Sequence, residues 1–390
     1  MPRCIPDDVA LHKNGAVTGR DGQAAAPDPP ETPVANLANV MTASMPAVLD
    51  YPFAAPPDPG TVIEVAPRVF WLRMPLPFAL DHINLWLLAD EDGFTLVDCG
   101  FGDGATRAIW ERHFATTLAV QPIRRIIATH CHPDHVGNAA WLSARFDAPV
   151  SMTPAEYLTA HALAGQHAGY GPGPTVRFFG RHGMAAEHVA AMEARGNHYR
   201  KGVPELPESF ERLQDGAEQT AGGTTWRVIE GHGHSPEHAS LHSRERNVLI
   251  SGDMLLPRIS TNVSVWAPEP DGDPLGAFLA SIAAFEMLPP DTLVLPSHGL
   301  PFRGIPVRVA QLASHHDARL SELAAAVDGA ASAVSAADVV PVLFRRELDL
   351  QQRYFAMGEA IAHLNHLWRT GRIARHVGAN GAVRFASASA

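Results

Sequence analysis

Five side chains of types that bind metal ions lie within one heptapeptide, Thr129-His130-Cys131-His132-Pro133-Asp134-His135. An apolar run at residues 123–129 leads directly into it and predicts a strand. Side chains two residues apart on an extended chain face the same way. His130 and His132 are therefore predicted to bind one ion together.

The second half of the heptapeptide changes the direction of the chain. Pro133 favours a turn into a helix. Asp134 and His135 then stand at the helix start, where we expect them to face a second ion. Cys131, which lies between His130 and His132, alternates away from these two ligand positions and is not predicted to be a ligand.

Four other segments place a histidine or an aspartate at a strand end or a glycine turn. They are Leu96-Val97-Asp98-Cys99-Gly100, Gly231-His232-Gly233-His234-Ser235-Pro236-Glu237-His238, Ser251-Gly252-Asp253 and Leu295-Pro296-Ser297-His298-Gly299. Around them, short β-branched or aromatic runs at residues 61–65, 69–72, 83–88 and 94–97 predict strands. A helical pattern near 104–118 follows, and strands and helices then alternate again. This order predicts a layered α/β fold.

The order of these segments resembles the metallo-β-lactamase superfamily, in its glyoxalase-II-like and lactonase-like branch, over about residues 61–305. The resemblance implies a four-layer αββα sandwich that binds two metal ions. It implies a first ion held by His130, His132 and His234, and a second held by Asp134, His135 and His298. It makes Asp253 the bridge between the ions and Asp98 a buried residue that orients the metal loop. The catalytic centre would then comprise Asp134 and Asp253 with a metal-bound hydroxide.

One ligand position has two candidates, His232 and His234. We favour His234, because the residues after it continue the loop pattern of the family. His238 is then expected to act as a local hydrogen-bonding residue.

The donor types agree with a two-ion centre. Three neutral imidazoles suit zinc, whereas the second set has more oxygen character and suits zinc, iron or manganese. Two adjacent cations lower the pKa of a bridging water toward neutrality and polarise a carbonyl or phosphoryl oxygen. Antibiotic-hydrolysing members of the family commonly have cysteine at the position of Asp253 or lack the bridge, so a β-lactam is not the expected substrate.

The composition is ordinary for a globular protein, with 46% hydrophobic and 18% charged residues in a chain of 390. The net charge of −11 opposes long-range attraction to nucleic acid and to anionic membranes. No apolar run approaches the roughly 20 residues that span a bilayer. Cys4, Cys99 and Cys131 give no disulfide framework, so a reducing cytoplasm is the expected location.

Three regions are expected along the chain. Residues 1–60 are rich in Ala, Pro, Gly and Asp and predict a disordered leader, with Met41 or Met45 as the hypothetical true start. N-terminal sequencing of the natively expressed protein would test this start. Residues 61–305 form the expected catalytic domain, with a helical insertion at about 154–215. Residues 306–390 form a helical and winged-helix-like C-terminal module.

Two regions outside the ligand segments have open roles. The insertion carries five histidines, His161, His167, His182, His188 and His198. It is interpreted either as a lid over the substrate or as a solvated helical hairpin. Residues 341–390 contain seven arginines and three acidic residues, which gives this segment a net charge of +4. Such a tail suits either nucleic-acid binding or packing and homodimer formation, and the absence of lysine clusters favours the second.

The expected activity is hydrolysis of an ester, thioester or lactone bond in a small molecule. The alternative is a nuclease or phosphodiesterase acting on RNA through the same ions. An iron-dependent persulfide dioxygenase and a hydrolytic dehalogenase are further alternatives.

Overall fold

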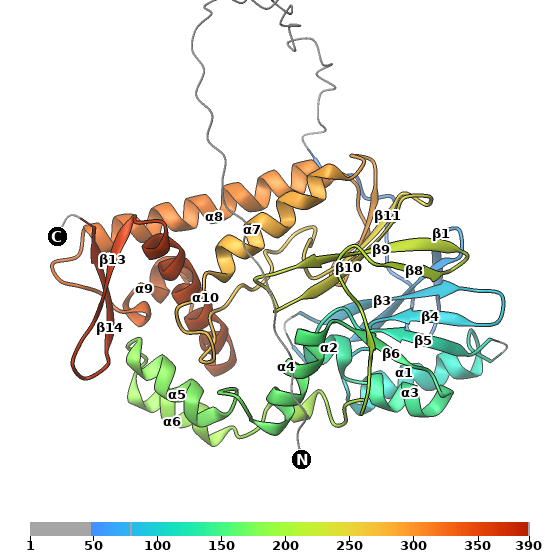
Figure 1. Ribbon diagram of the computed structural model, residues 1–390, viewed down its shortest axis with the longest axis horizontal. Coiled ribbons are helices and arrows are strands. Elements are labelled where there is room, and N and C mark those ends of the chain that lie inside the picture. Colours follow the sequence, from blue (N-terminus) through green and yellow to red (C-terminus); the bar gives the residue numbers. More distant parts are fainter. Residues whose placement is uncertain (1–47, 79, 120, 389–390) are drawn as a thin grey trace, which may run out of the picture. The chain divides into compact units, whose positions relative to one another are not determined.

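Two β-sheets form the centre of the computed structural model, which describes residues 48–78, 80–119 and 121–388 (Figure 1). The first sheet contains β1 (Ile63–Ala66), β2 (Val69–Pro75), β3 (His82–Ala89), β4 (Phe94–Val97), β5 (Ile123–Ile127), β6 (Val150–Met152) and β7 (Glu211–Arg212), in that spatial order. Pairing is antiparallel from β1 to β4 and parallel from β4 to β7. The change to parallel pairing comes where helices begin to connect the strands.

The second sheet has the order β12-β11-β10-β9-β8. Its strands are β8 (Glu218–Ala221), β9 (Thr224–Gly231), β10 (His238–Ser243), β11 (Val248–Gly252) and β12 (Leu293–Pro296). The sequence did not predict β10, because His-Ala-Ser-Leu-His-Ser has no β-branched residue. All six of its residues are buried between β9 and β11, so tertiary pairing decides its conformation.

Apolar side chains from both sheets meet in one core. Trp71, Trp86 and Ile127 of the first sheet belong to the same buried cluster as Trp226 and Ile250 of the second. On the outer side of the first sheet lie α1 (Gly104–Ala115) and α3 (Ala139–Phe146), and on that of the second lie α7 (Pro274–Ala284) and α8 (Ile305–Asp328) (Figure 1). The expected four-layer αββα fold is therefore confirmed.

Residues 154–215 contain α4 (Pro154–Gly165), α5 (Pro172–Arg181), α6 (Ala186–Ala194) and the short helix η2 (Tyr199–Lys201). The segment then returns to the first sheet through β7. Its helices also contact the C-terminal region, where Phe179 stacks edge-on against Tyr354 at a centroid distance of 5.5 Å. The insertion is thus anchored both in the first sheet and in the last helices of the chain.

The C-terminal region contains α8, α9 (Ala336–Leu343), α10 (Leu350–Arg369) and a hairpin of β13 (Ile373–Val377) and β14 (Val383–Ser387). Capping boxes fix the starts of α9 and α10, at Ser335 and Asp349. Its apolar residues share one buried cluster with α7 and the second sheet, including Phe278 and Val294. The region is therefore packed on the catalytic fold, and its winged-helix character stays a prediction.

Residues 48–60 differ from the expected leader. Asp50 pairs with Arg303 in an antiparallel bridge, and Leu49 is buried. Phe53 packs edge-on against Trp71 with ring centroids 6.2 Å apart. The catalytic fold therefore includes residues before 61, whereas the rest of the expected leader and the two proposed start methionines lie outside the described residues.

Within the described part of the chain, no helix is both long enough and apolar enough to cross a bilayer.

Candidate metal centre

Each segment singled out in the sequence follows the carboxyl end of a strand. Asp98 comes directly after β4, and the heptapeptide at 129–135 comes after β5. His234 follows β9, Asp253 follows β11, and His298 follows β12. Both sheets present these ends on the same side, so five loops distant in sequence converge.

Three histidines form the first ligand group. The Nε2 atom of His130 lies 2.9 Å from Nδ1 of His132 and 3.2 Å from Nε2 of His234. Burial, reinforced by the neighbouring imidazoles, holds the pKa of His130 and of His132 well below the ordinary value. Their rings are therefore neutral at physiological pH, and their ring nitrogens are free to act as metal ligands.

The second group consists of Asp134, His135 and His298. Oδ2 of Asp134 lies 3.6 Å from Nε2 of His135 and 3.5 Å from Nε2 of His298. Burial opposes protonation of His135, but the carboxylates of Asp98, Asp134 and Asp253 outweigh it and raise its pKa well above the ordinary value. The carboxylates around His135 therefore attract positive charge, whether a proton or a metal ion.

Asp253 joins the two groups through its two oxygens. Oδ2 lies 3.3 Å from Nε2 of His234. Oδ1 lies 3.6 Å from Nε2 of His135 and 3.4 Å from Nε2 of His298. Burial disfavours the ionised carboxylate, but His298 and His135 lower its pKa well below the ordinary range. One carboxylate therefore faces both groups at once.

The unpaired polar atoms of the site and the spacing of its donors fit metal ions. Nε2 of His135 and Oδ1 of Asp253 are buried and have no hydrogen-bond partner. Unpaired buried polar atoms are costly, and they are rare unless an ion or water satisfies them. The ligand atoms of each group also lie within 4.8 Å of one another. The donors, their spacing and their unmet bonding capacity fit two divalent ions.

The opposite ring nitrogens of the ligands are held by hydrogen bonds. Asp98 is fully buried and accepts a 2.8 Å bond from Nδ1 of His135 and bonds from the backbone N–H and hydroxyl of Thr129. Nδ1 of His234 donates to the carbonyl of Asn262, and Nδ1 of His298 donates to the carbonyl of His82, each at 2.8 Å. Such bonds direct each Nε2 lone pair into the centre.

The structure separates the two candidates for the disputed position. His234 lies in the first group, whereas the exposed His232 turns away and bonds through Nδ1 to the carbonyl of Pro236 at 2.7 Å. His238 accepts a 3.1 Å bond from the backbone N–H of Asp253, so it supports the bridging residue locally. Cys131 is buried outside both groups.

The sequence did not point to Glu156, Asn262 or His82. Glu156 accepts hydrogen bonds from the backbone of two metal loops, and the carbonyls of Asn262 and His82 accept hydrogen bonds from ligand histidines. None of them lies in a recognisable spacing pattern. Each acts through contacts between segments far apart in sequence.

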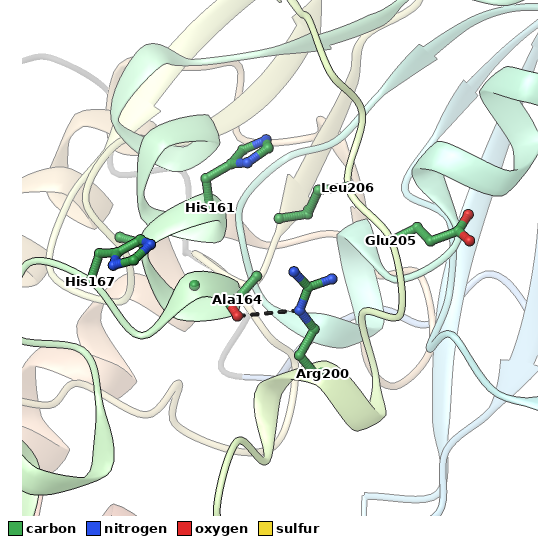
Figure 2. Close-up of a pocket in the computed structure, with 8 residues that line it drawn as sticks. His161, Ala164, His167, Arg200, Glu205 and Leu206 are labelled. Carbon is green, nitrogen blue, oxygen red and sulfur yellow. Dashed lines mark hydrogen bonds between the residues drawn. The ribbon is translucent and has the colours of Figure 1, made fainter.

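A hollow of about 610 Å³ lies on the insertion, away from the seven candidate ligands, none of which lines it (Figure 2). His161, His167 and Arg200 are among its lining residues. Figure 2 shows the Arg200 guanidinium bonded to the carbonyl of Ala164, at 3.2 Å. Two of the five insertion histidines therefore border this hollow, while His182 is buried and bonds to the carbonyl of Phe178.

Comparisons with known proteins agree with this geometry. A family model described as the metallo-beta-lactamase superfamily matches residues 79–298. A second, the metallo-beta-lactamase-like C-terminal domain, matches residues 320–388. The probable metallo-hydrolase YqjP of Bacillus subtilis (strain 168) is 23% identical over 327 residues, covering 77% of this chain and 92% of that protein.

Two solved structures resemble the whole fold. A beta-lactamase domain protein from Burkholderia ambifaria is 48% identical, with a TM-score of 0.81, and the match covers 87% of this chain and 98% of that one. A metallo-beta-lactamase family protein from Thermus thermophilus is 29% identical, with a TM-score of 0.70, over 83% of this chain and 100% of that one. With the family model spanning more than half of its length, this chain belongs to the metallo-beta-lactamase superfamily of metallo-hydrolases.

Proposed function

We propose that this protein is a dinuclear metal-dependent hydrolase that cleaves an ester, thioester or lactone bond of a small molecule. The observation that carries the proposal is the position of Asp253, whose two oxygens face the two ligand groups separately. Asp253 would hold both ions in this arrangement, and the two ions would together supply Lewis acidity to one bond. The choice of a carbonyl substrate rests on the family branch that the ligand segments resemble.

We assign the first ion to His130, His132 and His234, and the second to Asp134, His135 and His298, with Asp253 shared. The three-imidazole group favours Zn²⁺, and the second group also suits iron or manganese. Bound divalent ions would supply Lewis acidity and lower the pKa of water toward neutrality. The residues of this chain hold the charge and geometry that this chemistry requires.

The arginines of the C-terminal region favour a small substrate over RNA. Arg375 forms an ion pair of 2.7 Å with Asp271, and Arg369 donates to the carbonyl of the same residue. Arg345 lies 3.6 Å from the carboxylate of Glu322. These three cations have partners within the chain, although Arg345 is itself 74% exposed, whereas binding of nucleic acid requires basic side chains directed at phosphates.

A substrate panel with metal analysis tests the proposal. The purified protein should contain close to two transition-metal ions per chain and should hydrolyse thioesters, simple esters or lactones. Removal of metal by a chelator should abolish the activity, and added Zn²⁺ should restore it. Activity confined to phosphodiesters, with RNA binding that weakens steeply as salt rises, would instead establish the nuclease alternative. Hydrolysis that persists in metal-free protein would refute both.

A further inference from the structure

The insertion holds the first ligand group through one buried carboxylate, that of Glu156. We propose that Glu156 is a positioning residue, which fixes the two loops that carry His130, His132 and His234. This inference rests on the metal centre of the proposed function, but it concerns a residue outside that centre.

Glu156 stands in the first turn of α4 and is fully buried. Its Oε2 accepts a bond of 2.9 Å from the backbone N–H of Cys131, and its Oε1 accepts one of 2.8 Å from the backbone N–H of Glu237. Each oxygen thus binds a different metal loop. Cys131 lies between His130 and His132, and Glu237 comes three residues after His234.

The remaining contacts of these two loop positions also come from the insertion and its edge. The hydroxyl of Tyr199 donates to the carbonyl of Cys131 at 2.6 Å. Thr153 donates to the carbonyl of Glu237 at 2.8 Å, and the side chain of Glu237 accepts from the N–H of Ala155 at 3.1 Å. Hydrogen bonds therefore fix both the backbone N–H and the carbonyl of Cys131, and likewise both the backbone N–H and the carbonyl of Glu237.

The energetics favour a specific role over general packing. Among the described residues, no basic side chain forms an ion pair with Glu156, although burial of an unpaired carboxylate is costly. Two charge-assisted bonds to backbone N–H groups and the positive end of α4 offset this cost. A hydrophobic residue at this position would fill the space, but it would leave the buried N–H of Cys131 and the partly buried N–H of Glu237 unsatisfied.

The second ligand group is held by different contacts. Asp98 and Thr129 orient His135, and the carbonyl of His82 orients His298. None of these contacts involves the insertion. Disturbing Glu156 should therefore weaken the first ion selectively, whereas a general loss of folding would weaken both ions alike.

The test compares Glu156→Gln with Glu193→Gln, an exposed carboxylate on α6 of the same insertion. The amide of Glu156→Gln keeps the size of the side chain, but its NH₂ group would face one of the two backbone N–H donors. Zn²⁺ affinity of each site would be measured by chelator competition. Co²⁺-loaded protein would identify the sites by the shifted ring N–H signals of the bound histidines in ¹H NMR.

We expect wild type and Glu193→Gln to bind two Zn²⁺ ions. Glu156→Gln should bind the first ion at least about tenfold more weakly, following the usual cost of losing a residue that orients ligands. The Co²⁺ signals of His135 and His298 should persist. Tyr199→Phe, which removes one bond without creating a donor conflict, should weaken the same ion by a smaller factor.

Two results would overturn the proposal: wild-type affinity for both ions in Glu156→Gln and Tyr199→Phe, or equal weakening of both ions in Tyr199→Phe, the variant that retains the fold most easily. Wild-type protein that binds no second ion would instead refute the dinuclear centre of the proposed function, so the two failures are distinguishable.

Discussion

At the scale of single residues, Asp253 is the side chain on which the whole centre depends. Its Oδ2 faces His234 of the first ligand group, and its Oδ1 faces His298 of the second. Under the proposed assignment, loss of this side chain would remove a ligand from each ion at the same time.

Asp253→Ala should therefore reduce the metal content from two ions to one or fewer and lower the hydrolytic rate by at least about 100-fold, since metal chemistry supplies several kcal/mol of transition-state stabilisation. Metal analysis and steady-state rates measure both effects. Asp291→Ala, at an exposed position just before β12, is the matched control and should behave as wild type. Two bound ions with full activity in Asp253→Ala would contradict the bridging assignment.

Asp98 contributes through a neighbour rather than by direct contact with a metal. Its backbone is left-handed, with φ of 63°, a conformation that aspartate and asparagine tolerate. Asp98→Asn should therefore keep the turn but weaken the bond that orients His135. Affinity for the second ion should fall about 10- to 100-fold, as measured by chelator competition. The exposed Asp92→Asn is the control, and unchanged affinity in Asp98→Asn would show that orientation by this carboxylate is not required.

At the scale of secondary-structure elements, α10 reaches from the C-terminal region toward the metal loops. Its Glu359 accepts a bond of 3.1 Å from the side chain of Asn262, whose carbonyl holds His234. Burial raises the pKa of Glu359 from 4.5 to about 7. The helix thus contributes a carboxyl group that favours its protonated form close to the centre.

This shift makes a prediction about stability and pH. The folded state retains a proton on Glu359 that the unfolded state releases above its pKa of 4.5, so stability falls as pH rises from about 4.5 to about 7. In metal-free protein, Glu359→Gln should be more stable than wild type at pH 8, by up to roughly 3 kcal/mol. The difference should vanish near pH 4.5. Denaturant unfolding at several pH values measures it, and a difference independent of pH would contradict the assignment.

At the scale of the whole molecule, the C-terminal region and the catalytic fold share one buried cluster. Leu364 of α10 belongs to the same cluster as Phe278 of α7 and Val294 of β12. A continuous core of this kind couples the unfolding of its parts. The C-terminal region is therefore a structural component of the catalytic fold.

Leu364→Ala should accordingly destabilise the whole protein by about 2–5 kcal/mol, the usual cost of deleting a buried leucine side chain. Tryptophan fluorescence, to which Trp71, Trp86 and Trp226 between the sheets and Trp368 of α10 all contribute, should shift together with circular dichroism in one transition. Leu158→Ala, at a position that is 63% exposed, should change stability little. Two resolved unfolding transitions instead of one would show that the two regions unfold independently.

The sequence by itself indicated the layered fold, most of the strands and six of the seven residues proposed as ligands. It could do so because each ligand lies beside a strand end, where local periodicity and residue type are both informative. β10 has no β-branched residue and owes its conformation to pairing with β9 and β11, and β7 pairs with β6 across the insertion, so no local pattern predicted either strand. Only the tertiary structure decided between His232 and His234, because the direction of each ring depends on its bonding partner.

For the heptapeptide at 129–135 too, the sequence indicated some properties and the tertiary structure decided others. Its residue types and their spacing were enough to indicate the kind of chemistry. The tertiary structure decided that its backbone is held by Glu156 and Tyr199 of the insertion. Hydrogen bonds between segments dozens of residues apart have no periodicity in the sequence. The supports of the metal loops therefore became visible only once the chain had folded.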